Sequence, residues 1–220
     1  MSPLEGVPLS LPRKNKQRTL NDEEETAKEL VVGDEPKDSP LQELQSRAER
    51  LFEGIEARNA QCLERIHAQV PRLAKASSRE INIEHARTTL AREVGFKTWQ
   101  MATEVLEGRS VPGDDFGDFW YSTATDVMLS HWCRNYQEAR AVQEEEGGFL
   151  IPYRRHFAVV EKAYIEILGM DADDPDWQVV GHDVAQPRDK MGYRRLVSRR
   201  LERIQPDNKK AKARWVCLGK

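Results

Sequence analysis

The sequence predicts an all-α protein in which helical hairpins pack into an orthogonal-type bundle. Three observations support this fold class. Apolar residues recur every three or four positions along most of the chain. Ser, Asn, Thr and Gly residues stand where such helices would begin and end. Alternating strand patterns and internal repeats of convincing length are absent from the sequence.

Four parts are predicted along the chain. Residues 1–38 form a disordered arm, because they mix Pro, Gly, Lys and a short acidic run with few apolar anchors. Residues 39–108 form a helical hairpin module and residues 109–205 a helical domain. Residues 206–220 form a basic tail.

The hairpin module begins at Ser39 and Pro40, which suit a helix cap and a first helical position. An apolar stripe then runs to Ile55, and a second helical face ends near Pro71. The spacing predicts two further helices in the module. One begins after Asn82 and ends at Gly95, the other begins after Thr98 and ends at Gly108, and Gly95 is expected to adopt a left-handed conformation.

The helical domain begins, after a loop, with a long helical pattern from Phe116 to Trp132, which breaks near Asn135 and resumes to Gly147. The run Phe149–Tyr153 is strand-like, but its proline favours a buried extended connection. Three more helices are predicted. They are a helix through 157–167, a short helix from 174 and a final helix through 193–204.

The stretch from His85 to Trp99 resembles a small helical accessory module of bacterial proteins. The shared features are the sequence Leu90-Ala-Arg-Glu-Val-Gly95, the following Phe96 and the conspicuous Trp99. That module precedes ankyrin repeats in some bacterial proteins and accompanies glyoxalase-superfamily domains in others. The resemblance covers residues 41–108, about a third of the chain, and implies a helical accessory unit without catalytic residues.

Residues 88–105 also resemble a DNA-binding helix-turn-helix, with a small residue, Ala91, in the first helix and Gly95 in the turn. Its second helix would present Lys97, Gln100 and Thr103 to DNA. This is a poor set for phosphate and base contacts, so a structural hairpin is favoured and DNA binding is the alternative.

An anion-binding site is the best candidate for chemistry outside the module. Tyr153, Arg154, Arg155 and His156 place two guanidinium groups and an imidazole at a predicted helix start, where they suit phosphate or carboxylate. The favoured alternative is that these cations pair with acidic helices. A small enzyme built on this site is the least favoured function.

The charge of the chain is uneven. The net charge is -3, yet residues 188–220 hold twelve Lys or Arg against three Asp or Glu. This predicts a contact surface for an acidic protein partner or, non-specifically, for nucleic acid. Its members are Arg194, Arg195, Arg199, Arg200, Arg203, Lys209 and Lys210.

Neither a catalytic residue, nor a metal site, nor a cofactor is predicted. The five histidines lack partners at metal-ligand spacing, and Gly181-His182-Asp183 is interpreted as a capped loop. The three cysteines lie far apart and no segment has membrane-spanning length, which favours a cytoplasmic protein without a membrane partner. The predicted function is that of a non-enzymatic bacterial interaction or regulatory protein of unspecified oligomeric state.

Overall fold

A computed structural model describes residues 39–128 and 131–204. The predicted arm at 1–38 lies outside these residues. So does the predicted tail, with Lys209 and Lys210. Within the described residues, no helix combines the length and the apolar character needed to cross a bilayer.

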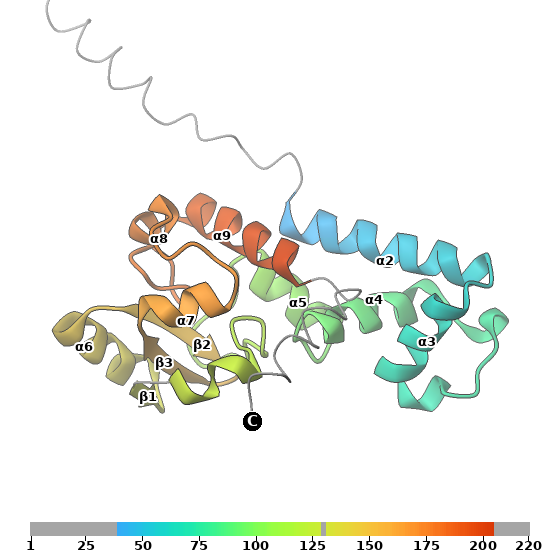
Figure 1. Ribbon diagram of the computed structural model, residues 1–220, viewed down its shortest axis with the longest axis horizontal. Helices are drawn as coiled ribbons and strands as arrows, with labels where there is room; N and C mark the ends of the chain where they lie inside the picture. Colours follow the sequence, from blue (N-terminus) through green and yellow to red (C-terminus); the bar gives the residue numbers. More distant parts are fainter. Residues whose placement is uncertain (1–38, 129–130, 205–220) are drawn as a thin grey trace, which may run out of the picture. The chain divides into compact units, whose positions relative to one another are not determined.

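Four α-helices form the first part of the fold (Figure 1). They are α2 (Pro40–Glu56), α3 (Ala60–Gln69), α4 (Ile83–Glu93) and α5 (Trp99–Leu106), with short 3-10 turns at Pro71–Leu73 and Ser78–Glu80. The predicted capping box at the first helix is confirmed, because the Ser39 hydroxyl accepts from the Gln42 amide at 3.2 Å and the Gln42 side chain accepts from the Ser39 amide at 2.8 Å. Asn82 and Thr98 cap α4 and α5 as predicted.

The corner between α4 and α5 confirms the left-handed conformation expected at Gly95, whose φ is +101°. The Gly95 carbonyl accepts from the Asp118 amide at 2.7 Å. A Cβ atom on Gly95 would lie 2.8 Å from the Asp118 carbonyl carbon, so the corner is packed closely against a segment from the second half of the chain.

A three-stranded antiparallel sheet shows that the all-α prediction is wrong (Figure 1). Its strands are β1 (His131–Cys133), β2 (Phe149–Tyr153) and β3 (His156–Val160), in the order β1-β3-β2. In the β2–β3 hairpin, Tyr153 pairs with His156 and Phe149 pairs with Val160. The fold is therefore mixed, with helices packed around a small sheet.

The strands escaped prediction because burial on both faces removes the alternation that identifies a strand. Four of the five residues in β2, and four of the five in β3, are buried. Pro152 is accommodated within β2, opposite Phe157. The aromatic residues from Phe116 to Trp132 have helical spacing, but no α-helix forms there. Phe119 and Trp120 lie in a turn and Trp132 lies in β1, with a 3-10 helix at Thr123–Met128 before that strand.

Helices cover the sheet. One face is covered by α6 (Tyr136–Glu146), which contacts all three strands. Phe149 on β2 packs against Trp177 of α8 (Pro175–Val180), with ring centroids 5.0 Å apart. The remaining helices are α7 (Lys162–Ile167) and α9 (Lys190–Arg203).

Helix α9 ties the predicted hairpin module to the predicted helical domain. The Tyr193 hydroxyl donates to the Val105 carbonyl at 2.7 Å, and Arg47 of α2 donates to the Leu201 and Ile204 carbonyls, both at 3.1 Å. These contacts hold the helices of the first half against the region that carries the sheet.

Candidate functional site

The four residues predicted to bind an anion lie at the turn between β2 and β3, not at a helix start. Arg154 and Arg155 form the turn itself, and Tyr153 and His156 are the strand residues that close it. Two further residues, which sequence reasoning did not connect to them, lie beside the turn: Trp132 of β1, through the sheet, and Tyr121, through its ring contact with Tyr153. We call these six residues the hairpin surface: Tyr121, Trp132, Tyr153, Arg154, Arg155 and His156.

Aromatic rings pack against one another across the hairpin surface. The ring centroids of Tyr121 and Tyr153 are 4.5 Å apart, those of Trp132 and Tyr153 are 5.5 Å apart, and those of Trp132 and His156 are 5.4 Å apart. Trp132 still exposes 43% of its surface. A large aromatic side chain is thus held on a strand by its neighbours and presented to solvent.

The two arginines of the turn differ in their engagement. Arg154 adopts a left-handed φ of 54°, pairs with Asp118 at 2.9 Å and lies 4.9 Å from the centre of the Tyr153 ring. The hydrogen bond to Asp118 raises the pKa of Arg154. Arg155 is exposed and has no hydrogen bond or ion pair to any residue that the structure describes. Its guanidinium is therefore available to a binding partner.

Three arginines of α9 are engaged within the protein. Arg195 and Arg199 each pair with Asp176 of α8, at 2.5 and 2.6 Å. Arg200 is 7% exposed and donates to the carbonyls of Phe119 and Leu168, at 3.1 and 2.7 Å. Burial lowers the pKa of Arg200 to about 10. Of the predicted basic surface, Arg194 is half-buried and Arg203 is exposed.

The helix corner presents few groups that suit DNA readout. Gln100 is exposed, but Lys97 pairs with Asp115 at 2.7 Å and the Thr103 hydroxyl donates to the Trp99 carbonyl at 3.0 Å. A cavity of about 400 Å³ lies at the start of α5. It is lined by Val70, Pro71, Arg72, Thr88, Arg92, Lys97, Thr98 and Trp99, a set with cations and without carboxylates.

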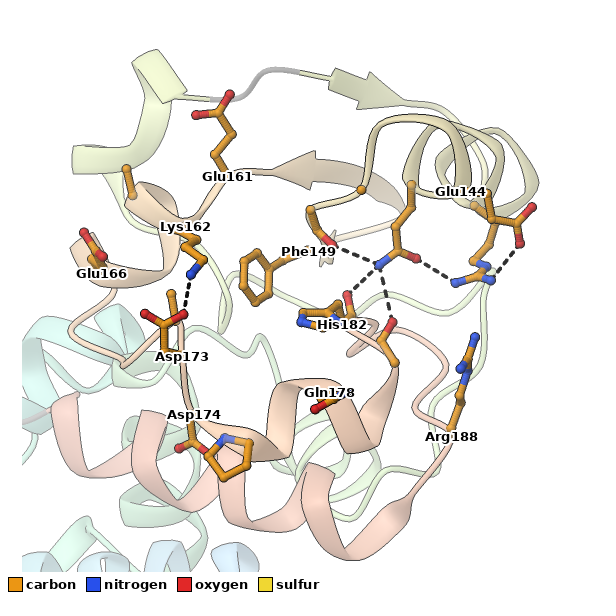
Figure 2. Close-up of a pocket in the computed structure, with 18 residues that line it drawn as sticks. Glu144, Phe149, Glu161, Lys162, Glu166, Asp173, Asp174, Gln178, His182 and Arg188 are labelled. Atoms are coloured by element: carbon orange, nitrogen blue, oxygen red, sulfur yellow. Dashed lines mark hydrogen bonds and ion pairs between the residues drawn. The ribbon is translucent and has the colours of Figure 1, made fainter.

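A larger cavity, of about 1090 Å³, lies between α6, α7 and α8 (Figure 2). The start of β2 and the turn at Gly181–His182 complete its wall. Gln143 holds two parts of that wall together, because its amide nitrogen donates to the Gly148 carbonyl at 3.2 Å and to the His182 carbonyl at 2.8 Å. We call this space the α6–α8 cavity.

His182 occupies an unusual backbone conformation in the α6–α8 cavity, with a φ of 54°. Its ring meets the edge of Phe149 at a centroid distance of 5.1 Å. Burial, together with the positive charge of Lys162, lowers the pKa of His182, so its imidazole is neutral at pH 7. Lys162 is itself paired with Asp173.

Sequence reasoning missed the α6–α8 cavity because its lining comes from five separate segments of the chain. Two local signals mark its wall, the Gly147-Gly148 pair and the turn at Gly181-His182-Asp183. Within the described residues, no three His, Cys, Asp or Glu side chains gather as a metal site would require. Comparisons with protein-family models, curated proteins and solved structures found no match.

Proposed function

We propose that this protein is a non-enzymatic interaction protein that binds an acidic segment of a protein partner through the hairpin surface. The observation that carries the proposal is Trp132, an exposed tryptophan fixed on a strand and surrounded by Tyr153 and His156. Tryptophan, tyrosine and arginine are the residues that most often dominate the energy of protein interfaces. All three types occur together on this surface.

Charge complementarity supports an acidic partner. Arg155 interacts with Asp115 only through its charge and forms no hydrogen bond or ion pair within the described residues, and the neighbouring Arg154 keeps its positive charge beside Asp118. Guanidinium groups bind carboxylates through paired hydrogen bonds, which fixes orientation as well as adding affinity. Arg194, Arg203 and the basic residues at 209–220 add longer-range attraction for the same partner.

The ring geometry favours a protein partner over single-stranded nucleic acid. The ring pairs of the hairpin surface are tilted, with interplanar angles of 46° for Tyr121 and Tyr153 and 65° for Trp132 and Tyr153. Successive bases need a series of open ring faces on which to stack. One exposed tryptophan with packed neighbours suits an interface anchor instead.

The test is a selection of linear peptides from a displayed random library on the full-length chain. The wild type is expected to enrich peptides rich in Asp and Glu, because Arg154 and Arg155 attract them. Trp132→Ala should weaken binding of a selected peptide by at least about tenfold. Arg155→Glu should reverse the charge preference. Val111→Ala is the matched control, since Val111 is 57% exposed and lies on a loop outside the hairpin surface.

Two outcomes would contradict the proposal. One is enrichment of the same peptides by the wild type and by Trp132→Ala. The other is a hairpin surface that binds an oligothymidine strand, with Trp132→Ala and Arg155→Glu abolishing that binding and leaving peptide binding intact. Thermal melts of each variant establish that the fold is retained.

The cationic cavity at the start of α5 favours a second candidate function, DNA binding by residues 88–105. Arg72 and Arg92 line this cavity and are the cations that would contact phosphate, whereas Lys97 is paired with Asp115. On this alternative, Gln100→Ala removes sequence preference in a duplex-binding assay at fixed salt, and Arg72→Ala weakens binding to all sequences equally. Duplex binding that does not distinguish between sequences would exclude this function.

A further inference from the structure

The two ends of the α6–α8 cavity carry opposite charges that form no hydrogen bond or ion pair within the described residues. Glu161 and Glu166 lie at the α7 end, and neither carboxylate hydrogen-bonds a residue that the structure describes. Arg188 lies at the other end, and its guanidinium likewise has no such partner. Figure 2 shows these charged side chains on opposite sides of the cavity.

The other charges of the cavity are neutralised locally. Lys162 pairs with Asp173, and Arg140 pairs with Glu144 at 2.8 Å. Asp174 pairs with Arg199 at 2.8 Å. Lys162 also interacts electrostatically with Glu166. The net charge is still negative at the α7 end, where carboxylates outnumber Lys162, and positive at Arg188.

A wall with two aromatic rings set edge to face separates the two ends. Phe149 and His182 form it, with their rings 5.1 Å apart at an interplanar angle of 68°. Figure 2 shows both rings between Glu161 and Arg188. Such a surface suits an apolar or aromatic group of a ligand.

The position of Arg188 depends on a glycine. The Arg188 amide donates to the Val180 carbonyl at 3.2 Å, and its side chain lies across Gly181. A Cβ atom at Gly181 would come within 2.8 Å of the Arg188 Nε atom. The close approach places the guanidinium at the rim of the cavity, beside the turn that carries His182.

We propose that the α6–α8 cavity binds a zwitterionic small molecule of the amino-acid or short-peptide class. Its cationic group lies at Glu161 and Glu166, its carboxylate at Arg188, and its apolar or aromatic middle against Phe149 and His182. This site shares no residue with the hairpin surface, so it is a binding activity additional to the function proposed above.

Size and charge limit the ligand class. A volume of about 1090 Å³ matches the upper range of small-molecule sites, and it leaves room for a dipeptide with its hydration. The cavity wall holds more carboxylates than cations, which disfavours nucleotides and other polyanions. The carboxylates are Glu144, Glu161, Glu166, Asp173 and Asp174, and the cations are Arg140, Lys162 and Arg188.

The test uses the dipeptide lysyl-phenylalanine as the probe, titrated into the full-length chain by calorimetry. Its C-terminal amide is the matched ligand that lacks only the carboxylate. The wild type should bind the free dipeptide roughly tenfold more tightly than the amide, because only the free carboxylate accepts charge-assisted hydrogen bonds from Arg188. Arg188→Gln should remove this preference. Arg79→Gln, at an exposed site outside the cavity, should keep it.

The opposite end is tested with norleucyl-phenylalanine, which lacks the lysine ammonium group. A variant carrying Glu161→Gln and Glu166→Gln should bind the two dipeptides equally, whereas the wild type should prefer lysyl-phenylalanine. Both glutamates are exposed, so these substitutions leave the core unchanged. The proposal is overturned if lysyl-phenylalanine does not bind at millimolar concentration, or if Arg188→Gln retains the preference for the free carboxylate.

Discussion

Gly95 shows how a single residue joins the two halves of this protein. Two separate properties require glycine at this position. Its φ of +101° is left-handed, and its close contact with the Asp118 backbone leaves no room for a Cβ atom. Gly113 has only the left-handed conformation, with a φ of +114°, because a Cβ atom there would meet nothing within 4 Å. Comparing substitutions at Gly95 and Gly113 therefore separates the cost of the left-handed conformation from the cost of the steric clash.

We predict that Gly95→Ala destabilises the protein more than Gly113→Ala, with the free energy of unfolding measured by urea titration. The left-handed conformation costs about 1–2 kcal/mol for an alanine at either position. The clash with Asp118 adds at least about 1 kcal/mol at position 95 alone. Equal losses at the two positions would mean that the corner is not held as the structure describes.

At the scale of elements, the junction of α8 and α9 depends on one carboxylate. Asp176 is 5% exposed and accepts hydrogen bonds from Arg195 and Arg199. Burial opposes its ionisation, but these hydrogen bonds outweigh burial and hold the pKa of Asp176 below its ordinary value. A carboxylate with a lowered pKa stabilises the fold above its unfolded-state pKa, and this stabilisation is lost as the pH falls through the folded-state value.

We predict that Asp176→Asn lowers the free energy of unfolding by about 3 kcal/mol at pH 7, because two arginines lose their anionic partner in a buried setting. The difference from the wild type should narrow as the pH falls through the lowered pKa of Asp176, where the carboxylate itself becomes protonated. Denaturant titrations of the wild type and Asp176→Asn at several pH values measure this difference in the free energy of unfolding. Asp173→Asn is the control, since Asp173 is exposed and its pair with Lys162 contributes little. A difference that is constant with pH would refute this role of Asp176.

The helix ends were predictable from local residues, whereas the sheet was not, because its strands lack alternation and β1 pairs with a distant segment. Ser39, Asn82 and Thr98 cap their helices through backbone groups three residues away, which a sequence shows directly. The strands β1 and β3 are far apart in sequence, so their pairing leaves no local pattern. The same limit applies to the candidate site. Arg154 and Arg155 were found as neighbours, whereas Trp132 joins them only through the sheet.

At the scale of the whole molecule, the count of basic residues overstated the free positive surface. Three arginines of α9 bind acidic residues or carbonyls inside the fold. The hairpin surface instead combines an exposed aromatic ring with the Arg155 guanidinium, which forms no hydrogen bond or ion pair within the described residues, and this is why it carries the proposed function. In the α6–α8 cavity, Glu161 and Glu166 lie at one end and Arg188 at the other, where we propose that a second, smaller ligand binds.

The central claim is tested most directly by a double-mutant cycle between Arg155 and a glutamate of the acidic peptide selected on the wild-type chain. Affinities are measured for the wild type and Arg155→Glu, each with the peptide and with its Glu-to-Lys counterpart. If Arg155 contacts the acidic segment, the reversed pair should recover binding, with a coupling energy of at least about 1 kcal/mol. A coupling energy near zero for every glutamate of the peptide would contradict binding through the hairpin surface.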